Sequence, residues 1–254
     1  MRNLVERIAA SATGGDNTGK KYEDVIPDYS AMGYKKFELY AVGRGASPDY
    51  SKGSKYYADM AKKHGLTYSS FHLPPIKDDN EASFEDALKW AQFAEELEIP
   101  ICVFNSFKKE SYTKLLNRMI DEIEKRNYRF NLVVQIHEGR AIETFEDIVD
   151  VLKEVKHPRV SALHELGSFH ALGVSWKKVI DTFWPRIGLF HLKDMVGPQS
   201  VAFGTGEVDF KGLFDEVDKI GYKGDFVIEL SPVDKENTNR YIREALQYLK
   251  QFDK

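Results

Sequence analysis

The chain has 254 residues, of which 42% are hydrophobic and 30% are charged, and its formal net charge is −4. Acidic and basic residues are interspersed without a basic stripe, which argues against nucleic acid as a partner. The single cysteine, Cys102, cannot form an intrachain disulfide, so a reducing compartment and hence a cytoplasmic location are predicted. No segment approaches the roughly 18 apolar residues of a membrane helix, and the N-terminal segment lacks the apolar run of a signal peptide.

Eight short apolar runs, rich in β-branched and aromatic residues, are typical of β-strands. They lie at residues 7–12, 35–41, 66–73, 99–107, 130–137, 159–166, 186–193 and 224–230. Apolar residues recur at helical spacing in four stretches between or after these runs, at 87–97, 111–123, 144–155 and 239–252. Ser83 and Thr144 each have an aspartate three positions later, so both are predicted to be helix N-caps.

Strands that alternate with helices predict a parallel sheet. Because about 250 residues is the typical size of a (β/α)8 TIM barrel, we predict that α/β fold for one domain spanning residues 1–254. The competing fold is a doubly wound open sheet. The glycine-rich segment 12–20 matches neither the dinucleotide-binding pattern nor the P-loop pattern, so it gives that competitor no support.

The carboxyl ends of the predicted strands, where a TIM barrel has its active site, are unusually polar. The residues at these ends are Glu38, His72, Asn105, Gln135, His137, His164, Glu165, His191, Lys193 and Glu229. Any one of them alone is more simply explained as a hydrogen-bonded structural residue. Together they predict a site for a polar ligand, because burying so many ionisable groups is costly unless they pair or bind something.

Side-chain alternation along the strands selects the residues that face one another. In residues 133–138, Gln135 and His137 share a face with Val133, whereas Glu138 falls in the following loop. Two carboxylates, an imidazole and an amide oxygen from four successive strands would suit one divalent cation, with Mn²⁺, Mg²⁺, Co²⁺ and Zn²⁺ all open. Such a metal would polarise a substrate carbonyl or hydroxyl while a nearby carboxylate moved a proton.

Several segments resemble one known family. They are "MGYKKFELY" (32–40), "FHLPP" (71–75), residues 144–165, "GLFHLKDM" (188–195) and residues 203–230, which contain G-x-G-x-V-D-F and end in a strand with Glu229. In these segments the chain is similar to the xylose isomerase-like TIM-barrel superfamily of sugar isomerases and epimerases. The resemblance spans nearly the whole chain and implies the same barrel fold.

The resemblance also implies site residues. The family typically holds its metal with Glu, Asp, His and Glu after strands five to eight, which correspond here to Gln135, Glu165, His191 and Glu229. Glu165 is a conservative departure, but Gln135 replaces a charged ligand and base. Glu229 is then the best proton-transfer group, with His137 and Lys193 as further catalytic candidates. The expected substrate-binding residues are Glu38, His72, Asn105 and His170.

The first functional hypothesis is a metal-dependent isomerase or epimerase acting on a small sugar, ketose or sugar phosphate. The runner-up is a lyase, dehydratase or hydrolase acting on a keto-sugar or keto-inositol. A sugar-binding barrel without activity is a third hypothesis, motivated by Gln135. All three predict a small sugar as the partner, without nucleic acid or membrane, and leave a homo-oligomer open.

Overall fold

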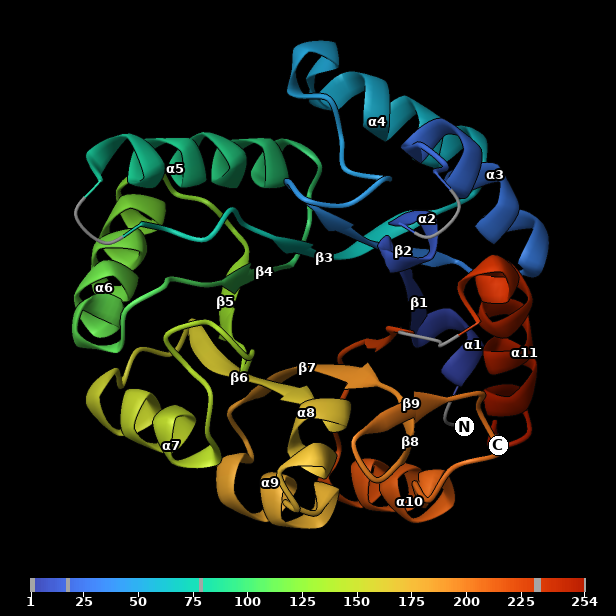
Figure 1. The fold of residues 1–254 in the computed structure, drawn as a ribbon. Helices are drawn as coiled ribbons and strands as arrows, with labels where there is room; N and C mark the ends of the chain where they lie inside the picture. Colours follow the sequence, from blue (N-terminus) through green and yellow to red (C-terminus); the bar gives the residue numbers. More distant parts are fainter. Residues whose placement is uncertain (1–2, 17–18, 78–79, 231–233, 254) are drawn as a thin grey trace.

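Eight parallel strands close into a barrel in the computed structural model of the chain, which describes residues 3–16, 19–77, 80–230 and 234–253 (Figure 1). The barrel strands are β1 (Ile8–Ser11), β2 (Lys36–Tyr40), β3 (Thr67–His72), β4 (Ile101–Phe104), β5 (Asn131–Val134), β6 (Val160–Glu165), β7 (Ile187–Leu192) and β10 (Phe226–Ile228). They are hydrogen-bonded in the order β1-β10-β7-β6-β5-β4-β3-β2, and β2 closes onto β1. The predicted (β/α)8 TIM barrel is confirmed.

Each predicted strand contains one observed strand, with its ends trimmed. The largest trimming concerns the run 99–107, which keeps only β4, and the run 130–137, which keeps only β5. At the end of β5 the backbone turns, because the His137 amide donates to the Ile142 carbonyl at 2.8 Å instead of to a neighbouring strand. Gln135 therefore lies just beyond the strand, at the start of the loop.

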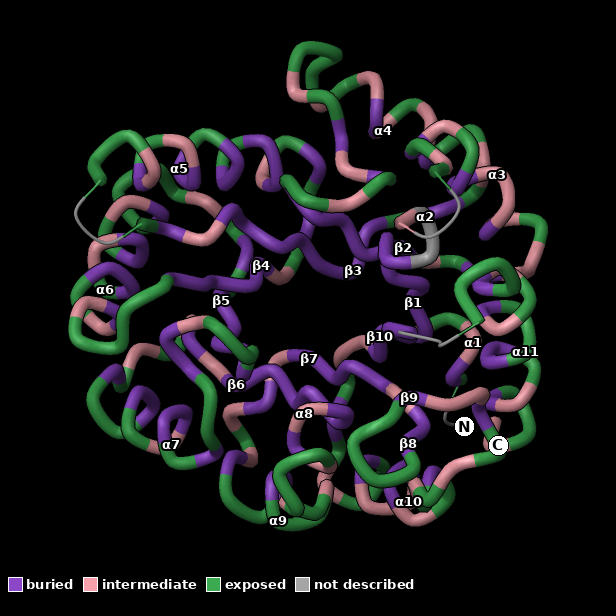
Figure 2. Tube along the Cα trace, viewed as in Figure 1, coloured by how far each residue is buried: buried purple, intermediate pink, exposed green. Residues whose placement is uncertain are grey.

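Helices cover the outside of the barrel, and they bury their apolar stripes against it (Figures 1 and 2). They are α1 (Leu4–Arg7), α2 (Thr13–Asp16), α3 (Tyr22–Met32), α4 (Gly53–Lys63), α5 (Glu81–Glu96), α6 (Lys109–Lys125), α7 (Phe145–Glu154), α8 (Leu166–Ala171), α9 (Trp176–Phe183), α10 (Phe210–Ile220) and α11 (Thr238–Lys250), with short 3-10 turns η1 (Tyr50–Lys52) and η2 (Lys235–Asn237). The four predicted helices correspond to α5, α6, α7 and α11. In the described part of the chain, no helix is long and apolar enough to cross a membrane.

One of the two predicted N-caps is confirmed. Thr144 caps α7 through a reciprocal pair of hydrogen bonds with Asp147, whose carboxylate accepts from the Thr144 amide at 2.9 Å. The prediction for Ser83 is wrong, because α5 begins three residues earlier. There the Asn80 side chain accepts from the Ser83 amide at 3.1 Å, and asparagine is as effective a cap as serine.

The barrel interior consists of an apolar layer beneath a polar one. One fully buried residue from each of six strands forms the apolar layer, namely Ala9, Val103, Val133, Leu163, Leu189 and Val227. Because alternate residues of a strand face the same way, the residues two positions later form the next layer towards the carboxyl ends. These residues are Ser11, Asn105, Gln135, Glu165, His191 and Glu229, and all six are buried.

Candidate active site

The β6, β7 and β10 ends carry the densest group of charges in the barrel. We call Glu165, His191, Lys193 and Glu229 the carboxylate side. Lys193 Nζ lies 2.9 Å from Glu229 Oε2 and 3.3 Å from Glu165 Oε1. His191 Nδ1 lies 2.8 Å from Glu165 Oε2 and 3.4 Å from Glu229 Oε2. Two buried carboxylates thus face two cationic or potentially cationic groups at short range, as the predicted inward orientation required.

Glu38, on β2, contacts the carboxylate side through His191. Its carboxylate is fully buried, and Oε2 accepts from Ser70 Oγ at 2.7 Å and lies 2.9 Å from His191 Nε2. His72 Nε2 lies 3.4 Å from the same oxygen, and the His72 ring stacks on Tyr40 with centroids 3.8 Å apart. Glu38 therefore holds Nε2 of His191, which leaves Nδ1 directed at Glu165 and Glu229.

The neighbouring charges decide the ionisation of this cluster. Burial alone would raise the pKa of Glu229, but Lys193 and His191 hold it well below its ordinary value. Burial alone would likewise lower the pKa of Lys193 and of His191, yet the surrounding carboxylates raise both. The pKa of Glu38 is lowered in the same way as that of Glu229, because His191 and His72 outweigh the effect of burial. The cluster is therefore a set of ion pairs.

The opposite part of the mouth, at the ends of β4 and β5, is built from amides. We call Asn105 and Gln135, with the loop residues His137 and Arg140, the amide side. Asn105 Nδ2 donates to Gln135 Oε1 at 3.3 Å, and Gln135 Nε2 faces Glu165 Oε2 at 3.5 Å. Because an amide nitrogen cannot ligate a metal, Gln135 in this orientation presents the wrong atom to the carboxylate side. Its role as a ligand stays a prediction.

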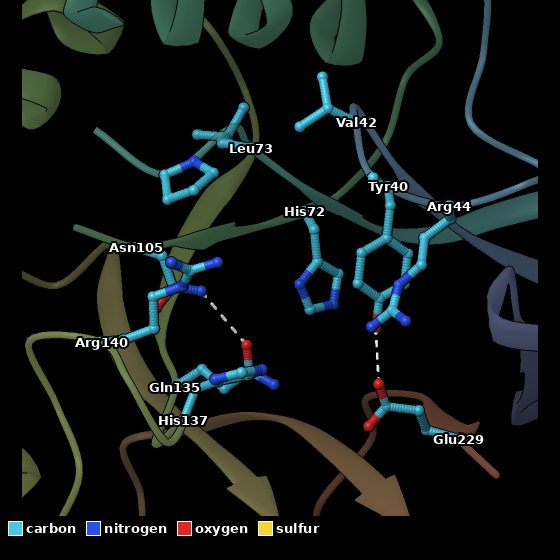
Figure 3. A pocket seen from close by; sticks show the side chains of 12 residues that line it. Tyr40, Val42, Arg44, His72, Leu73, Asn105, Gln135, His137, Arg140 and Glu229 are labelled. Atoms are coloured by element: carbon cyan, nitrogen blue, oxygen red, sulfur yellow. Dashed lines mark hydrogen bonds between the residues drawn. The ribbon is translucent and has the colours of Figure 1, made fainter. Parts of the chain in front are cut away.

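A cavity of about 250 Å³ separates the two sides (Figure 3). Five of the residues predicted at strand ends line it, namely His72, Asn105, Gln135, His137 and Glu229. Figure 3 shows Glu229 on one side of the cavity and Gln135, Asn105 and Arg140 on the other. In the described part of the chain, Glu229 is the one carboxylate among the lining residues, whereas Glu165 and His191 lie behind it.

Two histidines that follow or end β6 lie away from this cavity. His170, a predicted substrate ligand on α8, pairs through Nε2 with Glu207 at 3.3 Å, and both line a different hollow beside α9. His164 faces outward from β6, stacks on Phe190 and lies 3.2 Å from the Trp176 carbonyl. Burial lowers the pKa of His164 to about 4, which is expected of a neutral structural histidine. No contact joins His170 to the described cavity lining.

Sequence reasoning did not select three of the polar side chains that line the cavity, those of Tyr40, Arg44 and Arg140. Tyr40 donates its hydroxyl hydrogen to Glu229 Oε1 at 2.8 Å, and alternation would have found it, because it lies two residues after Glu38. Arg44 lies over the Tyr40 ring and pairs with Asp16 at 2.7 Å. Arg140 follows β5. Both arginines sit in loops after strands, where strand alternation gives no signal.

The motifs that carried the family resemblance support the position of Lys193. The Asp194 carboxylate accepts from the backbone amides of Gly204 at 2.8 Å and Gly206 at 3.0 Å, which ties the G-x-G loop beneath the end of β7. The short hairpin of β8 (Asp194–Val196) and β9 (Gln199–Val201) was not predicted and joins these segments. A side chain at Gly167 would meet Lys193 Cδ at 2.6 Å, so that glycine leaves room for the lysine.

The carboxylate side also fits the divalent cation that the family resemblance implies. Ligand atoms of Glu165, His191 and Glu229 all lie within 4.8 Å of one another, and two carboxylates with one imidazole are an ordinary donor set for such ions. Lys193 pairs with Glu165 and Glu229, the same two carboxylates that the ion would bind. The structure therefore brings three of the four predicted ligands together, without the Gln135 oxygen, and their role as ligands stays a prediction.

Comparison with known proteins assigns the chain to a family. A family model described as "Xylose isomerase-like TIM barrel" matches residues 26–252, and the chain belongs to this family. An inosose dehydratase of Geobacillus thermodenitrificans (strain NG80-2) is 29% identical over 156 residues, which cover 54% of this chain and 52% of that protein. The match thus spans about half the length of this relative.

Solved structures share the fold at low sequence identity. An AP endonuclease of family 2 from Brucella melitensis superposes with a TM-score of 0.78 and 15% identity, covering 98% of this chain and 100% of that one. The IOLI protein with a bound zinc atom has a TM-score of 0.75 and 16% identity, covering 97% of each chain. These likenesses establish the architecture, and the chemistry has to be argued from the site.

Proposed function

We propose that this protein abstracts a proton next to the carbonyl of a small polyhydroxylated ketone and eliminates water from it. The observation that supports this reaction is the single described carboxylate in the cavity lining, Glu229, with the amide of Gln135 on the other side. One base is enough for an elimination. An epimerisation that moves protons on both faces of a carbon usually needs two.

In the proposed reaction, Glu229 removes the proton from the carbon beside the carbonyl. The C–O bond at the next carbon then breaks, its electron pair leaves with the oxygen, and a proton from the Lys193 ammonium completes the water molecule. Lys193 is suited to this step because it lies 2.9 Å from Glu229 and keeps its proton beside two carboxylates. A divalent ion held by Glu165, His191 and Glu229 would polarise the carbonyl.

The other lining groups position the substrate. Asn105 Oδ1 is buried and lacks a hydrogen-bond partner among the described residues, so it can accept from a substrate hydroxyl. Tyr40 donates to Glu229, and burial together with Glu229 raises the pKa of its hydroxyl well above the ordinary value, so Tyr40 stays protonated. The similarity to an inosose dehydratase agrees with an elimination on a cyclic keto-polyol.

The test is to incubate the full chain with a keto-inositol in heavy water, with and without added Mn²⁺. We expect deuterium at the carbon beside the carbonyl and a product that has lost one water, and both should disappear in Glu229→Gln. Exchange that yields an epimer and no dehydrated product would favour the isomerase hypothesis instead. If keto-inositols, ketoses and keto acids all show neither exchange nor loss of water, the proposed function is wrong.

A further inference from the structure

The amide side contains one cation that the proposed reaction does not use. We infer that Arg140, assisted by His137, forms a subsite for a carboxylate or phosphate group, so that the natural substrate is an anionic keto-polyol. This inference rests on the proposed function, because it names the substrate class of the same cavity. It separates acidic substrates from the neutral sugars and keto-inositols that the fold also accommodates.

The guanidinium of Arg140 lines the cavity without an acidic partner among the described residues. Its recorded side-chain contact is with the Phe107 ring, whose centroid lies 4.3 Å from Cζ. The acid that follows in the same loop, Glu143, accepts from the Gly139 amide at 2.6 Å. Arginine binds carboxylates and phosphates through two parallel N–H donors, and no acid in the described part of the chain pairs with these donors.

Backbone hydrogen bonds hold the loop that carries this arginine. The His137 amide donates to the Ile142 carbonyl at 2.8 Å, and the Arg140 amide donates to the His137 carbonyl at 3.2 Å. The Ala141 amide donates to the Ser106 carbonyl at 3.0 Å, which joins the loop to the segment after β4. The loop backbone is thus ordered before any ligand arrives, so the loop itself has little order to gain on binding.

The charges around the cavity favour an anion beside Arg140 over one beside Arg44 or Glu229. Arg44 is the second arginine in the lining, but Asp16 at 2.7 Å neutralises it. Glu229 would repel an anion at its own side. A ligand bound through Arg140 would therefore direct its uncharged end, and with it the carbonyl, towards Glu229 across the cavity (Figure 3).

His137 supports the subsite from the same loop. Its Nδ1 lies 2.6 Å from the Glu138 carbonyl, which can only accept, so Nδ1 carries a hydrogen. His137 and Arg140 both line the cavity. With the Nδ1 hydrogen directed to the Glu138 carbonyl, Nε2 can donate to an oxyanion only from the protonated ring, so the Arg140 guanidinium is the main directed contact. The flanking amides of Asn105 and Gln135 suit hydroxyl groups.

The experiment compares ligands that differ by one anionic group, using calorimetric binding to the full chain at constant ionic strength. The probes are D-fructose against D-fructose 6-phosphate, and xylitol against D-xylonate, which differ only at one end of the same open five-carbon chain. We expect at least one anion to bind about tenfold or more tightly than its neutral parent, as for a charge-assisted bidentate contact. The phosphate pair and the carboxylate pair show which oxyanion the subsite prefers.

Three variants assign that preference. Arg140→Gln should remove the advantage of the anion, Arg140→Lys should keep part of it, and Arg243→Gln, on the exposed face of α11, should leave it unchanged. Equal binding of anionic and neutral probes, or an advantage that survives in Arg140→Gln, overturns the inference. Binding is measured without turnover, so its failure is distinct from a failure of the deuterium-exchange test of the proposed reaction.

Discussion

The two sides of the barrel mouth are built by the same strand alternation but differ in charge. On the carboxylate side, Glu165, His191, Lys193 and Glu229 are joined by contacts of 2.8–3.4 Å. On the amide side, Asn105 and Gln135 make one long amide contact of 3.3 Å. The first arrangement fixes charges where a proton can move, and the two amides of the second offer uncharged donors and acceptors to hydroxyl groups.

The contrast shows how one barrel can separate chemistry from recognition. A paired carboxylate is held ionised by its neighbours, whereas an amide pair can exchange its partner for a ligand at little electrostatic cost. The position of Gln135 decides this division, because a carboxylate there would extend the charged cluster across the cavity. Changing residues on either side therefore tests whether the division is real.

Glu229→Gln should have the largest effect. It keeps the shape of the side chain but removes the base, so we expect proton exchange and turnover to fall about 10²- to 10⁴-fold. The measurement is deuterium incorporation by NMR, with a keto-inositol as the test compound. Glu138→Gln, in the exposed loop after β5, is the matched control and should keep full activity. Equal rates in both variants would remove Glu229 from the mechanism.

Lys193→Met should have the largest effect on stability. It leaves Glu165 and Glu229 without their shared cation, and because Lys193 is 16% exposed we expect a loss of about 2–3 kcal/mol in unfolding free energy. Urea denaturation measures it, and added Mn²⁺ should restore part of the loss by taking the place of the lysine. Lys55→Met, which breaks an exposed pair with Asp59, should change stability by less than about 0.5 kcal/mol.

Most of the barrel and the inward polar layer followed from the sequence, because both depend on short periodicities. Val133 and Gln135, or Val227 and Glu229, share a face whatever the rest of the chain does. The predicted strands extended up to three residues too far, since the true ends depend on turns such as the one in which the His137 amide donates to the Ile142 carbonyl.

The part of the site that escaped prediction depends on contacts distant in sequence. Arg140 reaches the cavity because its loop is tied to Ser106, and Arg44 is directed there beside Asp16. The family resemblance implied a substrate-binding role for His170, but His170 lies on the short helix α8 and pairs with Glu207 instead. Loop geometry of this kind is set by tertiary hydrogen bonds, which local spacing does not record.

Gln135→Glu directly tests the separation between the charged carboxylate side and the amide side. Without metal, a carboxylate beside Glu165 should lower the unfolding free energy by about 1–3 kcal/mol through like-charge repulsion. With Mn²⁺ we expect a larger rise in melting temperature than in the natural protein, because the new oxygens complete the ligand set. Gln135→Met, which loses the amide contacts without adding charge, should gain no metal dependence. Equal metal-induced shifts in all three proteins would show that position 135 is not part of the metal site.

The smallest effect concerns Asp147, which holds the end of the loop that carries Arg140. Burial raises its pKa, but Lys109 and the amides of Glu143 and Thr144 outweigh it and bring the pKa to about 2, below the ordinary 3.8. The folded state thus binds this proton less readily than the unfolded state. The contribution of Asp147 is complete above pH 3.8 and is lost as the pH falls towards 2.

We expect this loss to be about 1–2 kcal/mol, because Lys109 is largely exposed and its contribution is screened. Urea denaturation as a function of pH measures it. Asp147→Asn should already be destabilised at neutral pH and lose less on acidification, whereas Asp121→Asn on the exposed face of α6 should follow the natural protein. If the acid sensitivity of Asp147→Asn matches that of Asp121→Asn, the amide side keeps its loop without this carboxylate. Its order must then come from the backbone hydrogen bonds at His137 and Ala141 alone.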